Sequence, residues 1–193
     1  MNKIILLSVV ISTVILSTSR GQDLTSGLEI GANCPAFDPH HVSGPDKNSK
    51  TCPMCKYGIR SQGLIIWVND TDWKTLEPIL ARLENEASTR GLRRFRVFVV
   101  YMNPERKPVG DAMREASDVA NRLKLKQVAL TVIPKPDDPE SAKIYNINTD
   151  SQIRNTVLVY SKRKVVYKTT NLAEKGLNDL MRICDELFAK DPL

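Results

Sequence analysis

Two cysteines separated by two positions are the residues best suited to chemistry in this 193-residue chain, in the segment Cys52-Pro53-Met54-Cys55. In such a pair one thiolate attacks a partner's disulfide, and the second cysteine resolves the mixed disulfide that forms. Nearby cations raise the reactive thiolate fraction, and Lys56 directly follows the second cysteine. The pair therefore predicts thiol-disulfide exchange or redox sensing, with Cys52 and Cys55 as the catalytic residues and with no cofactor.

Further soft metal ligands lie just upstream of this pair. Cys34 precedes it, and the only two histidines of the chain, His40 and His41, fall in between. Thiolate and imidazole ligands suit Zn²⁺ or copper, and Cys52 and Cys55 have the spacing of a metal knuckle. Binding or delivery of copper or zinc through these five residues is therefore the alternative function.

A second alternative assigns the cysteines a structural role only. A bridge between Cys52 and Cys55, or between Cys34 and one of them, would staple a long loop and stabilise the fold by about 2–4 kcal/mol. The protein would then be a non-catalytic interaction domain. The sequence leaves the pairing among these three cysteines open. Cys184 lies in the apolar stripe of the C-terminal helical segment and is predicted to be an inert core residue.

The N-terminus predicts export. Residues 1–3 form a short basic start, and residues 4–16 are almost wholly apolar. Ser19 and Gly21 are small residues at the two positions that a signal peptidase reads, so we place the cleavage point after Gly21. This is the pattern of a secretory signal peptide, and disulfides persist in the compartments beyond the cytosol. We expect a periplasmic or secreted protein with no membrane span in its mature form. The expected organisation is a signal peptide (1–21), an N-terminal extension with the Cys/His loop (22–63) and a domain core (64–193).

The charge of the chain limits the classes of partner to be expected. A formal net charge of +6 at pH 7 is mild for a chain of this length, and no aromatic residues interleave with the basic clusters. A nucleic-acid partner is therefore not expected. Protein thiols or a redox partner protein are the partners that the cysteine pair implies.

Strands and helices alternate along the part of the chain that must position the pair. Continuous apolar runs predict strands, and apolar residues at helical spacing predict helices between them. Alternation of this kind predicts an α/β domain with a central mixed sheet and helices on both faces. Leu28–Gly31 is a possible edge strand and Asn33–Thr51 a long loop. The expected strands are 64–68, 94–101, 128–133, 156–160 and 164–168, and the expected helices are 73–90, 111–125 and 174–189.

This order resembles the thioredoxin-like fold, over roughly residues 28–189. Lys74 and the run Pro78-Ile79-Leu80 are similar to residues that follow the active Cys-x-x-Cys of thioredoxins. The segment 31–37, with Gly31, Pro35 and Phe37, is similar to the opening of redoxins, which include peroxiredoxins. The resemblance implies an oxidoreductase, and exported copper-delivery proteins of this fold are consistent with the metal alternative.

The usual active site of that fold is missing from this sequence. Asp70 and Trp73 stand where the two catalytic cysteines of thioredoxins are expected, and Asn155 stands where a cis-proline normally faces them. No Pro-x-x-x-Thr-x-x-Cys motif of a peroxiredoxin is present either. No catalytic role is therefore transferred to these three positions. The sequence instead places its reactive sulfurs ahead of the first inner strand.

Overall fold

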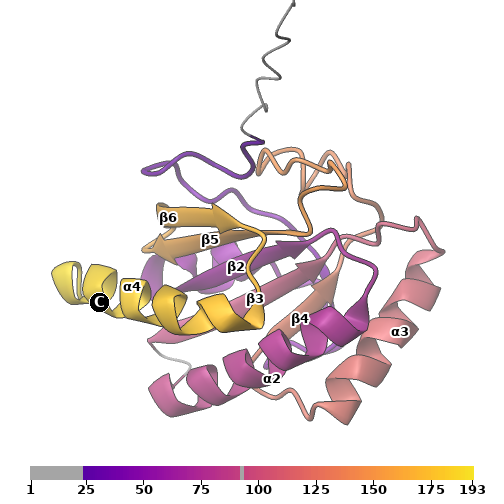
Figure 1. The fold of residues 1–193 in the computed structure, drawn as a ribbon, viewed down its shortest axis with the longest axis horizontal. Helices are drawn as coiled ribbons and strands as arrows, with labels where there is room; N and C mark the ends of the chain where they lie inside the picture. Colours follow the sequence, from indigo (N-terminus) through magenta and orange to yellow (C-terminus); the bar gives the residue numbers. More distant parts are fainter. Residues whose placement is uncertain (1–23, 92–93) are drawn as a thin grey trace, which may run out of the picture.

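A six-stranded mixed sheet with the order β1-β4-β3-β2-β5-β6 forms the centre of this computed structural model (Figure 1). The structure describes residues 24–91 and 94–193, so the predicted signal peptide lies outside the described residues. Strands β2, β3 and β4 run parallel, and β1, β5 and β6 are antiparallel to their neighbours. The strands are β1 His40–His41, β2 Gln62–Val68, β3 Phe95–Tyr101, β4 Ala129–Val132, β5 Asn155–Ser161 and β6 Lys164–Thr170.

Three long helices cover one face of this sheet (Figure 1). Strands β2, β3 and β4 are parallel, and each is added to the sheet on the same side of the one before it. Right-handed crossovers therefore place the two connecting helices on the same face. Asp72 caps the first of them by accepting a 3.0 Å hydrogen bond from the Lys74 backbone N–H. No helix within the described residues has the length and apolar composition to cross a membrane. The helices are α2 Trp73–Arg90, α3 Val109–Arg122 and α4 Leu177–Lys190.

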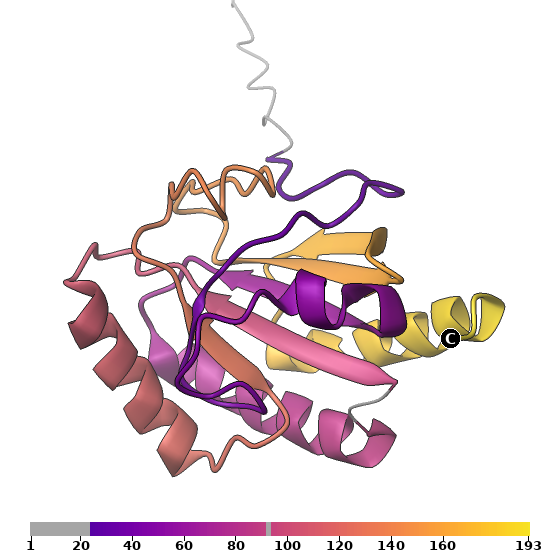
Figure 2. The same ribbon diagram turned by 180° about the vertical axis from the view of Figure 1, so that it is seen from behind.

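The opposite face is covered by the short helix α1 (Pro53–Lys56), a 3-10 turn at Gly58–Arg60, and irregular chain (Figure 2). Three aromatic rings hold that irregular chain on the sheet. Phe37 packs 5.2 Å from both Trp67 and Tyr145, and the last two rings lie 4.8 Å apart. These contacts join the N-terminal segment, strand β2 and the connection between β4 and β5. The predicted α/β architecture with a central mixed sheet is confirmed.

Two details of the N-terminal segment differ from the prediction. Leu28–Gly31 forms no strand, because Gly31 adopts a left-handed φ of +90° and only Asn33 makes an isolated bridge, to Lys164 of β6. Within the predicted loop, His40 and His41 form β1, which pairs with β4. The segment thus contacts the sheet at β6 on one edge and at β4 near the other, and it forms no strand longer than two residues.

Candidate functional site

A disulfide joins Cys52 to Cys55, with their Cα atoms 5.3 Å apart. Cys52 is the N-cap of α1, and its Sγ accepts a 3.0 Å hydrogen bond from the backbone N–H of Cys55. Pro53 occupies the first helical position, where its fixed φ favours a helix start and its missing N–H costs nothing. The Cys-x-x-Cys segment therefore folds into one helical turn that brings the two sulfurs together.

The two sulfur-bearing residues differ in exposure. Pro53 and Met54 are buried against the sheet, whereas Cys55 and Lys56 are exposed. Cys52 is half-buried and packs against the apolar cluster that contains Met54. Cys55 is therefore the accessible end of the disulfide and Cys52 the sheltered end.

Polar contacts fix α1 at both ends. The buried ring of His41 donates from Nε2 to the carbonyl of Thr51, at 2.8 Å, immediately before Cys52. At the other end, Lys56 forms an ion pair with the buried carboxylate of Asp46. Burial alone would raise the pKa of Asp46, but hydrogen bonding and the charge of Lys56 outweigh it and lower that pKa. The turn that carries the disulfide is thus anchored to the segment 41–51.

The residues after α1 are wedged between β3 and the β5–β6 turn. The guanidinium of Arg96 lies 3.6 Å from the ring centroid of Tyr57, and Phe98 stacks on the same ring at 6.2 Å. At Gly58, an added Cβ would lie 2.4 Å from Cγ of Arg163. These contacts fix where α1 ends relative to the sheet.

Cys34 takes no part in the bridge. It is fully buried, and its backbone N–H donates to the carbonyl of Arg163 at 2.7 Å. Burial raises the pKa of its thiol to about 12, against a smaller lowering by the Arg163 charge. Cys34 is therefore a neutral thiol at physiological pH. Cys184 is buried on the inner face of α4, as predicted, and burial likewise raises the pKa of its thiol to about 12.

The structure does not assemble the alternative metal site. No group of three or more His, Cys, Asp or Glu side chains in residues 24–91 and 94–193 is arranged to hold an ion. The sulfurs of Cys52 and Cys55 bond to each other, Cys34 is a buried protonated thiol, and His41 donates Nε2–H to a carbonyl. His40 is the neighbouring strand residue, so its side chain points to the other face of β1. The prediction of a copper or zinc site at these five residues is not supported.

The usual active-site position lies at the other end of β2 from α1. Trp73 begins α2 and packs on Tyr101, with ring centroids 4.6 Å apart. The side chain of Asn155 bonds to both backbone groups of Leu172, at 2.9 Å each. Asp70 lines an open cavity of about 510 Å³ at this edge. Packing holds Trp73 and hydrogen bonds hold Asn155. None of the three positions offers a thiol.

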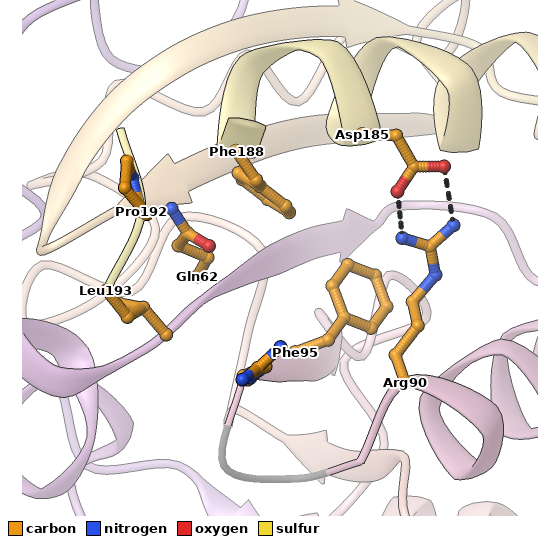
Figure 3. Close-up of a pocket in the computed structure, with 8 residues that line it drawn as sticks. Gln62, Arg90, Phe95, Asp185, Phe188, Pro192 and Leu193 are labelled. Carbon is orange, nitrogen blue, oxygen red and sulfur yellow. Dashed lines mark hydrogen bonds and ion pairs between the residues drawn. The ribbon is translucent and has the colours of Figure 1, made fainter. Parts of the chain in front are cut away.

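A further cavity of about 480 Å³ lies between the end of α4 and the starts of β2 and β3 (Figure 3). Phe95 and Phe188 face each other across it, with ring centroids 6.2 Å apart. Arg90 pairs with both carboxylate oxygens of Asp185 at its rim, as Figure 3 shows. Its lining contains no cysteine or histidine, so it does not extend the thiol chemistry of α1.

The buried His41 makes the stability of the site depend on pH. Burial lowers the pKa of its ring from the ordinary value of 6.5, which outweighs the hydrogen bond to Thr51 and the charge of Asp46. Below pH 6.5 the unfolded chain therefore binds more protons than the folded chain. The free energy of unfolding consequently decreases as the pH is lowered. We expect the wild type to lose more stability between about pH 8 and pH 5 than His41→Gln, as measured by urea unfolding of the oxidised protein.

The matched control for this measurement is His40→Gln. The His40 ring is partly exposed, and burial followed by the Lys50 charge lowers its pKa as well. We expect this variant to keep most of the wild-type pH dependence. Equal pH dependence in the wild type and in His41→Gln would contradict the assignment of His41 as a neutral buried donor.

The sequence did not identify the residues that anchor α1. By residue type His41 suggests a metal ligand, and no motif around Tyr57 or Arg96 indicates a role for either residue. The contact between the last two joins residues 39 positions apart in the sequence, with no periodic pattern to indicate it. Pro53 at a helix start was the one local signal for α1.

Several solved structures with the same fold are of redox proteins. A peroxiredoxin-like protein from Aquifex aeolicus matches with a TM-score of 0.58 and 15% identity, over 84% of this chain and 90% of that chain. A protein from Chlorobium tepidum assigned as the thiol:disulfide interchange protein DsbE matches with a TM-score of 0.56 and 15% identity, over 81% and 98%. A yeast mitochondrial 1-Cys peroxiredoxin matches with a TM-score of 0.55 and 19% identity, over 85% and 79%.

Sequence comparison adds no closer relation. No protein-family model matches the sequence, and the search of curated proteins gives no match. At these identities the structural matches establish the architecture, and they agree with the resemblance that the sequence indicates. The chain has the thioredoxin-like fold of peroxiredoxins and thiol-disulfide oxidoreductases, with its Cys-x-x-Cys disulfide placed on a helical turn ahead of the first inner strand.

Proposed function

We propose that this protein exchanges thiols and disulfides with partner proteins through Cys52 and Cys55. The observation that carries the proposal is the disulfide on α1, with one exposed and one half-buried cysteine. Exchange requires a sulfur that a partner can reach and a second sulfur that can leave and return. The arrangement on α1 supplies both.

The difference in exposure assigns a role to each sulfur. A partner thiolate attacks Sγ of Cys55, a bond forms between these two sulfurs, and the electron pair of the broken disulfide goes to Sγ of Cys52. The backbone N–H of Cys55, 3.0 Å from that sulfur, favours the departing thiolate. A second partner thiolate then attacks the partner's bonded sulfur and releases Cys55. The partner is oxidised to a disulfide, and the pair on α1 takes up two electrons and, from solvent, two protons.

A purely structural role accounts less well for this bridge. It closes a loop of only a few residues, so its effect on the entropy of the unfolded chain is small, about 2 kcal/mol. The contacts of His41, Lys56 and Tyr57 already hold the turn in place. A structural disulfide would also gain nothing from an exposed sulfur.

Redox equilibration tests exchange against a structural bridge. The protein is equilibrated in glutathione buffers of graded potential, and free thiols are alkylated and counted by mass spectrometry. We expect Cys52 and Cys55 to be reduced together at a midpoint between about −120 and −270 mV, the range of exchange proteins. A bridge that stays oxidised below about −300 mV would reject the proposal and favour a structural disulfide.

We further propose that the protein works outside the cytosol, in the periplasm or as a secreted protein. The apolar segment 4–16 and the small residues Ser19 and Gly21 support a cleaved signal. A disulfide with an exposed sulfur is consistent with an oxidising compartment. N-terminal sequencing of the mature protein tests this, with a start at Gln22 as the expected result and an intact Met1 as the contrary one.

A further inference from the structure

The surface beside the exposed sulfur of Cys55 carries an excess of positive charge. Between Asp46 and Asp70 the chain contains no acidic residue, and this stretch includes Lys50, Lys56 and Arg60. Lys56 and Arg60 are exposed on α1 and on the 3-10 turn that follows it. The local sequence thus surrounds the disulfide with cations only.

Strand register brings further cations to the same end of the sheet. Gln62, two residues after Arg60, pairs with Phe95 on β3 and with Ser161 on β5, which in turn pairs with Lys164 on β6. Figure 2 shows the purple helix α1 beside the turn between β5 and β6, in agreement with the close approach of Arg163 to Gly58. The cations near the end of α1 are then Lys56, Arg60, Arg96 and Arg163. Lys164 shares the face of its partner Ser161, which bonds to Asp191 after α4, and so lies on the other side of the sheet.

Few of these charges are neutralised. Asp46 pairs with Lys56, and Asp191 pairs with the neighbouring Lys162. Arg60 and Arg163 take part in no ion pair within residues 24–91 and 94–193. Next to Arg60, the side chain of Ile59 is 67% exposed. The surface beside Cys55 therefore combines an apolar side chain with unpaired cations.

We propose that the partner is a protein with an acidic segment around its reactive cysteines, which docks over α1 and the 3-10 turn. This inference rests on the proposed exchange function and specifies its partner class. Complementary charge steers a partner toward the site and raises the association rate. Ile59, next to Arg60, offers an exposed apolar contact within this surface, as in interfaces with a small apolar core and a polar rim.

The test compares two reduced peptides that carry the same Cys-x-x-Cys, flanked by glutamates in one and by lysines in the other. Each peptide's rate of oxidation by the oxidised protein is divided by its rate with neutral hydroxyethyl disulfide, which removes differences in thiol pKa. At about 20 mM salt we expect the acidic peptide to react on the order of tenfold faster, and at about 300 mM the ratio should approach one.

Charge-reversal variants locate the effect. We expect the double variant Arg60→Glu/Arg163→Glu to abolish or invert the preference for the acidic peptide at low salt. Lys74→Glu is the matched control, because Lys74 is an exposed lysine on α2, at the opposite end of β2. This control should keep the wild-type ratio.

The outcomes separate the two proposals. Equal rates for both peptides, or an unchanged ratio in the double variant, overturn the acidic partner and leave exchange itself intact. A ratio that changes as much in Lys74→Glu as in the double variant also overturns it, because net charge alone then explains the preference. Failure of both peptides to react contradicts the exchange function and the partner class together.

Discussion

The Cys52→Ser variant is expected to accumulate a mixed disulfide through Cys55 and to lose exchange activity by on the order of 100-fold or more. Its single exposed thiol still attacks a partner's disulfide, but no second thiol within the protein can resolve the product. Serine keeps an oxygen at the N-cap that can accept from the backbone N–H of Cys55, so α1 is retained. Mass spectrometry under non-reducing conditions, after incubation with a disulfide-bonded peptide, measures the trapped adduct.

The opposite substitution tests the roles of the two sulfurs. In Cys55→Ser the remaining thiol is half-buried against the apolar cluster, so we expect trapping at least about tenfold slower than in Cys52→Ser. Cys184→Ala, which leaves both sulfurs of the pair in place, should keep full exchange activity. Faster trapping by Cys55→Ser would reverse the two roles. Undiminished activity in Cys52→Ser would reject exchange through this pair.

Sequence patterns predicted the scaffold because its elements are long and periodic. The apolar run 64–68 forms most of β2. Asp72 and Gly91 are the N-cap and the C-cap of α2, as capping preferences indicate. The stripe that contains Cys184 became the buried face of α4. These features depend on neighbours within a few turns of chain, which a single sequence records directly.

The candidate site was predicted in composition but not in arrangement. Which cysteines pair depends on where the chain places them, and Cys34 is packed under Arg163, which lies 129 positions away in the sequence. A helix of four residues is too short to show a 3.6-residue period, so the turn at the cysteines went unpredicted. His41 reads as a ligand by residue type, and only its burial against Thr51 reveals an anchor.

The β2–β3 pairing at Gly63 makes the start of β2 intolerant of any side chain. Gly63 stands opposite Arg96 in the parallel ladder and opposite Tyr160 in the antiparallel one. An added Cβ would lie 1.8 Å from the carbonyl oxygen of Arg96, which is backbone and cannot rotate away. Since β2 is held by strands on both sides, relief requires separation of β2 from β3 at the point where Arg96 supports Tyr57.

Gly63→Ala is therefore expected to lower the free energy of unfolding by about 3 kcal/mol or more, as measured by urea unfolding followed through tryptophan fluorescence. Gly110→Ala is the matched control, because no atom lies within 4 Å of an added Cβ at this helical position. There the same methyl group should stabilise the protein by up to about 1 kcal/mol. Equal, small effects at the two glycines would show that β2 and β3 are not in this register. The contact between Arg96 and Tyr57, which anchors α1, would then also be wrong, because it depends on where β3 places the guanidinium.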